Sequence, residues 1–222
     1  MSNQRVDLYK DVHKGLRYEL FAFSIKAGSI DWDNTDSTKA LGEELDTLLH
    51  LLRSHVVHEN TFCHPLITRL VLGGARALDI EHREQEAMLD DLEAHFKHMI
   101  SKGSGRRSLV KDGIQFYRAL NRSLARYLVH LDQEEAQVMP TLWDLCSDEE
   151  LTGVLGEIIA SMKPEEFLSY LEVMFPAMNT EERANILSGL RSSAPEEFYN
   201  TVCKLAERLL SQTEWTTLKA HL

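Results

Sequence analysis

Apolar residues recur along this chain at spacings of three and four positions rather than at alternate positions. That spacing places them on one face of an α-helix, whereas alternation would place them on one face of a strand. Glycine and proline, which interrupt regular structure, number only 11 and 5 among the 222 residues. The pattern predicts an all-α protein.

Four long helices are predicted in the first two thirds of the chain. They cover about 4–26, 37–71, 76–100 and 107–143, with turns at Gly28–Asn34, Gly73-Gly74 and 102–105 between them. Helices of this length that are joined by short loops predict an up-down-up-down four-helix bundle.

After Cys146 the pattern changes to a tail of short amphipathic helices. Helix-start signals (N-cap residues, a proline at the first position, acidic first turns) occur at Ser147–Glu150, Lys163–Phe167, Asn179–Glu182, Ala194–Phe198 and Ser211–Glu214. The sequence Pro-Glu-Glu-Phe occurs twice, at 164 and 195, which indicates either a repeated helical hairpin or the general likeness of acidic helix starts. We therefore divide the chain into a bundle at 1–145 and a helical extension at 146–222.

The helices of this extension are too short to be stable alone. Each carries a narrow apolar stripe that needs a partner surface, and the nearest along the chain is the bundle end with Trp143 and Leu145. We expect the extension to pack on the bundle or on a second subunit, and to serve as a surface for a homodimer or a protein partner.

Composition narrows the class of protein. The 35 acidic residues against 24 basic ones leave a net charge of −11, which argues against a nucleic-acid-binding surface. No apolar run approaches the ~18 residues that span a bilayer, and the first thirty residues are charged where a signal peptide would be apolar. Three cysteines without a CxxC pair predict neither a disulfide framework nor a thiolate zinc site. We expect a cytoplasmic protein that binds neither nucleic acid nor membrane.

Two of the predicted helices contain matching polar segments. His55–Pro65 and His130–Pro140 each begin with a histidine, carry a glutamate four residues later and end with a proline six residues after that. Residues four apart lie on one helical face, about 6 Å apart along the axis. Each pair can present an imidazole nitrogen and a carboxylate to one metal ion, or to two neighbouring ions.

A helical wheel at about 100° per residue shows that these pairs face the core. Glu59 falls near the middle of the apolar arc of its helix, and Glu134 falls within the arc of the other. A carboxylate in an apolar seam is costly unless charged partners neutralise it, and the sequence offers no obvious buried Lys or Arg for both. Bound metal meets that need.

His82 and His13 also face the interior in this projection. His82 lies about 50° from the centre of the apolar arc of its helix, and His13 lies about 50° from the arc of its own helix. Their polar neighbours project elsewhere. Glu86 lies about 90° from the centre of its arc, His58 at the edge of its arc, and His50 and His64 on the solvent side. Glu135 competes with the glutamate before it for the same face, and the matched spacing favours the earlier one.

The order of these residues resembles the H-HxxxE-H-HxxxE pattern of the hemerythrin-like (HHE cation-binding) domains. The matching positions are His13, His55, Glu59, His82, His130 and Glu134. The resemblance covers roughly residues 5–145. It implies a four-helix bundle that holds two non-haem irons, with carboxylates and an oxo group bridging them and histidines as terminal ligands.

Two departures from the oxygen-carrying hemerythrins bear on function. Those proteins have a second histidine on the third helix and HxxxxD on the fourth, whereas this chain has Glu86 and an HxxxE. The pattern is nearer to iron- and redox-responsive members of the family. It therefore implies a protein that senses or handles iron, oxygen or a related oxidant. Alternatives are an enzyme using the same site, for consumption of peroxide or nitric oxide or donation of iron to damaged clusters, and a metal-free helical interaction module.

Overall fold

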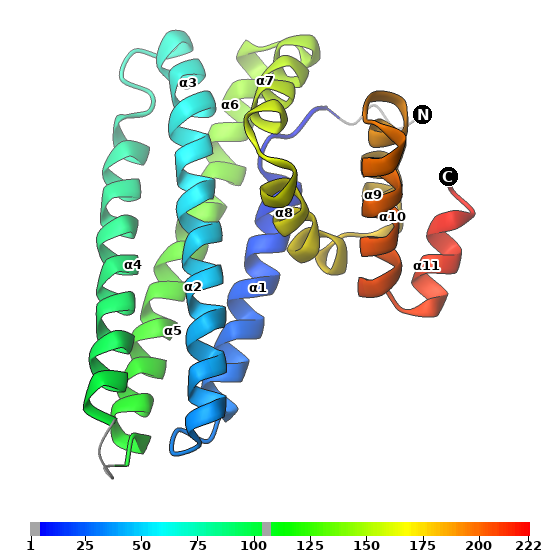
Figure 1. The fold of residues 1–222 in the computed structure, drawn as a ribbon. Helices are drawn as coiled ribbons and strands as arrows, with labels where there is room; N and C mark the ends of the chain where they lie inside the picture. Colours follow the sequence, from blue (N-terminus) through cyan, green and yellow to red (C-terminus); the bar gives the residue numbers. More distant parts are fainter. Residues whose placement is uncertain (1–4, 104–107) are drawn as a thin grey trace. The chain divides into compact units, whose positions relative to one another are not determined.

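A computed structural model describes residues 5–103 and 108–222. These residues form helices and turns without any strand (Figure 1), so the all-α prediction is confirmed for them. They divide into two compact units. The first contains Arg5, Val6 and Glu19–Ile158, and the second contains Asp7–Tyr18 and Ile159–Leu222. Part of the predicted turn at 102–105 lies outside the described residues.

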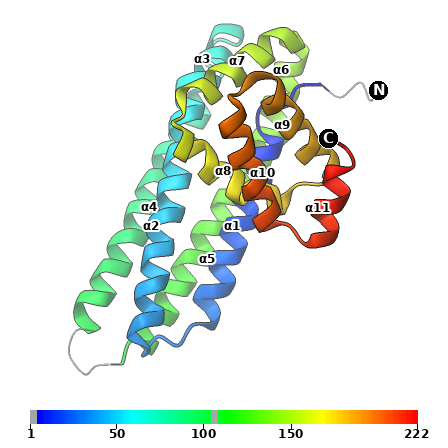
Figure 2. The same cartoon turned by 45° about the vertical axis from the view of Figure 1, so that its right-hand side comes forward.

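The first unit is built around long helices that lie side by side (Figures 1 and 2). Among its elements are the C-terminal part of α1 (Lys10–Ser29), α2 (Thr35–His58), α4 (Arg76–Gly103), α5 (Val110–Gln133) and most of α7 (Asp148–Ser161). The helix α4 packs against both α2 and α5. Leucines on α2 that recur every three or four residues, such as Leu41, Leu45 and Leu48, are buried in the core, as amphipathic helices require.

Residues of the loop before α2 form hydrogen bonds with the backbone at the start of two helices. Asn34 caps α2 by accepting a hydrogen bond from the Ser37 amide at 3.0 Å. Asp33 accepts one from the Leu109 amide at 2.8 Å, directly before α5. Trp32 packs so closely on Gly113 that a Cβ there would lie 2.2 Å from the indole ring. A side chain at this position of α5 would therefore displace the loop.

The predicted first helix begins later than expected, at Lys10 rather than at residue 4. One carboxylate oxygen of Asp7 accepts hydrogen bonds from the amides of Tyr9 and Lys10, both at 2.9 Å. Because short polar side chains compete with the helix for backbone amides, Asp7 ends the irregular N-terminal segment and starts the helix there.

Each of the two long helices predicted at 37–71 and 107–143 contains a π-helical turn that the wheel did not anticipate. The turn η1 (Glu59–Cys63) separates α2 from α3 (His64–Leu70), and η2 (Glu134–Val138) separates α5 from α6 (Met139–Leu145). In each turn the amide of the residue before the proline donates to the carbonyl of the glutamate five residues earlier. A proline ring clashes with the carbonyl four residues before it, and the wider π turn accommodates that ring.

These two stretches are equivalent segment by segment. We refer to Thr35–Leu70 and Val110–Leu145 as the two rods. Each rod consists of an α-helix of 24 residues, a π turn of 5 residues and an α-helix of 7 residues. The histidine, glutamate and proline of the matching segments occupy the same positions in both rods.

The extension contains regularly spaced helices. Those of the second unit are α8 (Pro164–Ala177), α9 (Thr180–Ser193), α10 (Glu196–Leu209) and α11 (Gln212–Lys219). Together with α7 they begin at 148, 164, 180, 196 and 212, hence every 16 residues. Asn179 and Ser211 form capping boxes with glutamates three residues later, which confirms the start signals. At α10, Pro195 is the N-cap rather than the first helical residue.

The second unit has a hydrophobic core of its own. Its buried members are Leu171, Phe175, Ala184, Leu187, Val202, Ala206, Leu210, Trp215 and Leu218. The helix α8 packs against α10, and α9 against α11. The phenylalanines of the two Pro-Glu-Glu-Phe sequences, Phe167 and Phe198, contact each other with ring centroids 6.1 Å apart. The two sequences therefore begin two helices, α8 and α10, that pack against each other.

The apolar stripes of α8–α11 pack on one another within the second unit. That unit also contains the first part of α1, where a Cβ at Gly15 would lie 2.9 Å from Met174 Cγ of α8. Packing of the extension on the bundle or on a second subunit stays a prediction. Neighbouring short helices that stack as hairpins bury a continuous core together, as repeat proteins do.

Candidate metal centre

Three histidines and two glutamates converge inside the first unit at the level of the π turns. Glu59 and Glu134 are the first residues of η1 and η2. His55 and His130 lie four residues before them, and His82 comes from α4. All five side chains belong to residues that are at most 4% exposed.

The imidazole of His82 lies between the two carboxylates. Its Nε2 is 3.3 Å from Glu59 Oε2 and 3.8 Å from Glu134 Oε1. On either side, His55 Nε2 is 3.1 Å from Glu59 Oε1, and His130 Nε2 is 3.3 Å from Glu134 Oε1. The Nε2 atoms of His82 and His130 are 3.1 Å apart. Each carboxylate thus faces imidazole nitrogens from more than one helix.

These residues form two overlapping groups that can hold a metal ion. The ligand atoms of Glu59, His82, His130 and Glu134 all lie within 4.8 Å of one another, and so do those of His55, Glu59 and Glu134. Both glutamates belong to both groups. Imidazole and carboxylate ligands suit several divalent first-row metals, including iron, so the donor set fits the metal that the resemblance implies.

Hydrogen bonds from other helices orient two of the imidazoles. His82 Nδ1 is 2.8 Å from Asn60 Oδ1, and His130 Nδ1 is 2.8 Å from Glu81 Oε2. Because these oxygens accept, each Nδ1 carries the proton and each Nε2 faces the centre. Carboxylates and carbonyls commonly fix metal-binding histidines in this way. Asn60 and Glu81 were not predicted, because their partners come from another helix.

The carboxylates change the protonation of the histidines. Burial lowers the pKa of His82, but its ion-pair interactions with Glu134 and Glu59 outweigh burial and raise that pKa to about 9. The pKa of His130 is also raised, since its bond to Glu134 outweighs the effect of burial. A bound metal ion would take the place of these protons, as metal binding to histidine generally does.

His13 is the remaining predicted ligand. It is fully buried on α1, with its ring centroid 5.3 Å from that of Tyr9. This part of α1 belongs to the second unit. The place of His13 at the centre therefore stays a prediction.

The prediction for His64 was wrong. The wheel placed it toward solvent, whereas it is buried, with Nδ1 2.7 Å from Asp79 Oδ1 and its ring stacked on His82 at 4.7 Å. A π turn adds one residue to the helical register, and that residue rotates everything after it by about 100°. The rotation brings His64 from the solvent side to the core.

The other weighed neighbours lie outside both groups. Glu86 accepts a hydrogen bond at 3.0 Å from Arg53, which also binds Asp90. His58 and Glu135 are half-buried, and neither belongs to the two groups found among the described residues.

Gln85 is a further interior residue that the sequence reading missed. It is 5% exposed, and its side-chain amide has no hydrogen-bond partner among the described residues. The wheel contains a signal for it, since Gln85 lies about 60° from His82 and close to the centre of the apolar arc.

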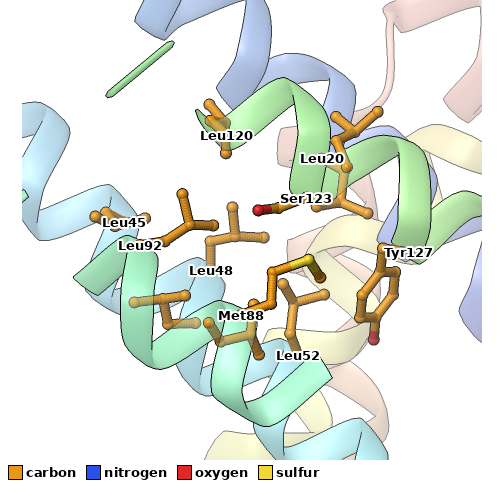
Figure 3. A pocket seen from close by; sticks show the side chains of 12 residues that line it. Leu20, Leu45, Leu48, Leu52, Met88, Leu92, Leu120, Ser123 and Tyr127 are labelled. Atoms are coloured by element: carbon orange, nitrogen blue, oxygen red, sulfur yellow. The ribbon is translucent and has the colours of Figure 1, made fainter. Parts of the chain in front are cut away.

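A small apolar cavity lies one helical turn from the histidines (Figure 3). Its volume is about 10 Å³. Leu52, three residues before His55, and Tyr127, three residues before His130, are among its lining residues. The lining is otherwise made almost entirely of leucine side chains from α1, α2, α4 and α5.

Comparison of the chain with models of protein families, with characterised proteins and with solved structures finds no match. The resemblance to hemerythrin-like domains therefore rests on the residues of the centre themselves. Within the described residues, no helix combines the length and the apolar character that a membrane span requires.

Proposed function

We propose that the chain is a hemerythrin-like protein that holds two non-haem irons in an up-down-up-down four-helix bundle and senses or handles iron, oxygen or a related oxidant. The observation that carries this proposal is that two groups of potential ligands share both Glu59 and Glu134. A carboxylate that belongs to two neighbouring groups is suited to bridge two ions.

The proposal gives each residue a role. Glu59 and Glu134 would be shared by both irons, His82 and His130 would hold one iron, and His55 would hold the other. The chemistry that bound iron supplies is electron exchange with a small oxidant at an open coordination position. The chain itself excludes water from the ligands by burial, and Asn60 and Glu81 hold two imidazoles in place.

His13 is proposed as a further ligand of the iron that His55 binds. Along the continuous helix α1, the residues His13, Leu16, Leu20 and Phe23 recur at spacings of three and four and are all buried. Leu20 lines the cavity next to the centre. Helical periodicity therefore supports a position of His13 on the same face of α1 as Leu20.

The proposal is tested by elemental analysis of protein purified from iron-replete cells, together with an optical spectrum of the oxidised protein. Two irons per chain with charge-transfer absorption are expected. Substoichiometric metal without that absorption would leave the metal-free interaction module as the better reading. Detectable turnover of peroxide or nitric oxide by the loaded protein would assign an enzyme to the same site.

We also propose a cytoplasmic location and a role of the helical extension in pairing with a second copy or a protein partner. Stacked helical hairpins such as those of α8–α11 present extended surfaces that repeat proteins use for binding. Light scattering of the purified chain tests the pairing, with a dimeric mass as the expected result.

A further inference from the structure

The amide of Gln85 is in an unusual environment for a polar group. It is 5% exposed, and neither its oxygen nor its nitrogen has a hydrogen-bond partner among the described residues. Buried polar groups in native proteins are nearly always hydrogen-bonded to protein or to ordered water. An amide without a partner costs free energy, so its position calls for a ligand that it can bind.

The register of α4 shows on which face of the helix Gln85 lies. The buried residues Leu78, His82, Gln85, Leu89 and Leu92 recur at spacings of four, three, four and three, and so form one stripe along the helix. His82 belongs to the candidate metal centre, whereas Leu89 and Leu92 line the cavity. Gln85 therefore lies between the centre and the cavity.

The cavity beyond Gln85 is small and apolar. Figure 3 shows leucines gathered around it, with Tyr127 at one side. A volume of about 10 Å³ is near the lower limit for one water molecule, and a water needs two to four polar partners. The hydroxyl of Ser123, a polar group of the lining, already donates to the Ala119 carbonyl at 3.2 Å. The space suits the end of a diatomic or triatomic molecule better than a water.

We propose that Gln85 is a binding residue for small ligands of the metal centre. Its amide N–H donates a hydrogen bond to a diatomic molecule or a small linear anion that binds on the cavity side, between His82 and Leu89. This inference rests on the proposed function, because it needs a loaded centre. It goes beyond that function by naming the group that selects the ligand.

The test uses azide as the probe and Gln85→Leu as the variant, with Gln85→Met as a second variant of different shape. Ser123→Ala is the matched control, since Ser123 lines the same cavity but has a backbone partner. Three quantities are measured: iron per chain, the azide dissociation constant of the oxidised full-length protein from its optical titration, and the thermal stability of the metal-free protein.

We expect parental iron content in all variants. The azide dissociation constant should rise by about tenfold or more in both Gln85 variants, as loss of a hydrogen bond to a charged ligand predicts, and stay unchanged in Ser123→Ala. The metal-free Gln85→Leu protein should be at least as stable as the parent, because it no longer buries an amide without a partner.

Unchanged azide affinity in iron-loaded Gln85 variants would overturn this inference and leave the iron proposal standing. A large loss of metal-free stability would also overturn it, since Gln85 would then belong to a structural network. Absence of iron from the parent protein would overturn the proposed function itself, together with this inference.

Discussion

Two groups of buried charges, one in each unit, are compensated in different ways. In the second unit, Glu182 accepts hydrogen bonds from Lys14 at 2.6 Å and from Lys10 at 3.0 Å, and buried Arg183 donates to the Phe175 carbonyl at 2.7 Å. These partners are permanently charged or are backbone groups. In the first unit, Glu59 and Glu134 face imidazoles, which carry charge only when they are protonated. The buried charges of the second unit are neutralised by neighbouring charged groups of the protein. The buried carboxylates of the first unit can instead be neutralised by a bound cation.

The pKa values of the buried groups in the two units differ in the same way. Burial raises the pKa of Glu182, but hydrogen bonds from Lys14, the Asn179 amide and Lys10 outweigh burial and lower it to about 2. The glutamates of the bundle instead raise the pKa of His82 to about 9. Near neutral pH, Glu182 is therefore locked in an ion pair, while His82 holds a proton that a metal can displace.

The largest expected effect is loss of metal from the bundle cluster. Glu59→Ala and Glu134→Ala should each lose most of the bound metal, because a bridging carboxylate serves both ions. Glu86→Ala and His58→Ala should keep it, since neither residue belongs to the two groups. Metal per chain by elemental analysis is the measurement. Equal loss of metal in all four variants would show that these residues are assigned to the wrong helical faces.

A substitution among the buried charges of the second unit should have the opposite effect, a loss of stability without a loss of metal. Arg183→Met should destabilise the protein by about 2–3 kcal/mol, because it leaves the Phe175 carbonyl buried without its charged donor. Denaturant unfolding measures the loss, and metal content should not change. Arg208→Met is the control, because the pair of Arg208 with Glu172 is largely exposed, and such pairs contribute little. Equal destabilisation by both substitutions would contradict the distinction between the buried Arg183 and the exposed Arg208.

Neutralising one carboxylate in each cluster should change stability in opposite directions. In metal-free protein at a pH above about 9, where His82 is neutral, Glu134→Gln should be at least as stable as the parent, because it removes one of two neighbouring buried carboxylates. Glu182→Gln should lose about 1–2 kcal/mol, because it removes ionic hydrogen bonds. Thermal unfolding of both variants without metal tests this. A clear loss in Glu134→Gln would mean that its charge is structural.

The smallest effect is the acid sensitivity of the second unit. The folded pKa of Glu182 lies below its ordinary value of 4.5, so its ion pairs contribute stability above pH 4.5 that is lost as the pH falls toward about 2. Unfolding free energies at pH 6 and pH 3 should therefore differ less in Glu182→Gln than in the parent. An identical difference in both proteins would exclude Glu182 as a source of the acid sensitivity.

Features encoded locally were predictable from the sequence. The capping boxes at Asn179 and Ser211 depend on residues three positions apart, so the helix starts of the extension were found. The pairs His55–Glu59 and His130–Glu134 precede any change of helical register, and the wheel put them on the faces that converge.

Features that depend on register or on other helices were missed. The wheel assumed a uniform helix, so it placed His64 correctly for an α-helix but wrongly for a helix with a π turn. The prolines at 65 and 140 signal that turn, but only when their effect on the preceding carbonyl is considered. Asn60 and Glu81 bind histidines of other helices, and no spacing within one helix reveals such a contact.

The equivalence of the two rods bears on how such a bundle arises. Each rod has one surplus residue in its helix, in the π turn that its glutamate begins. In evolutionary terms, a single-residue insertion at the same position of both rods would produce this arrangement. Duplication of one ancestral hairpin would supply both copies at once, and a homodimer of that hairpin would bring two such glutamates together across its two-fold axis.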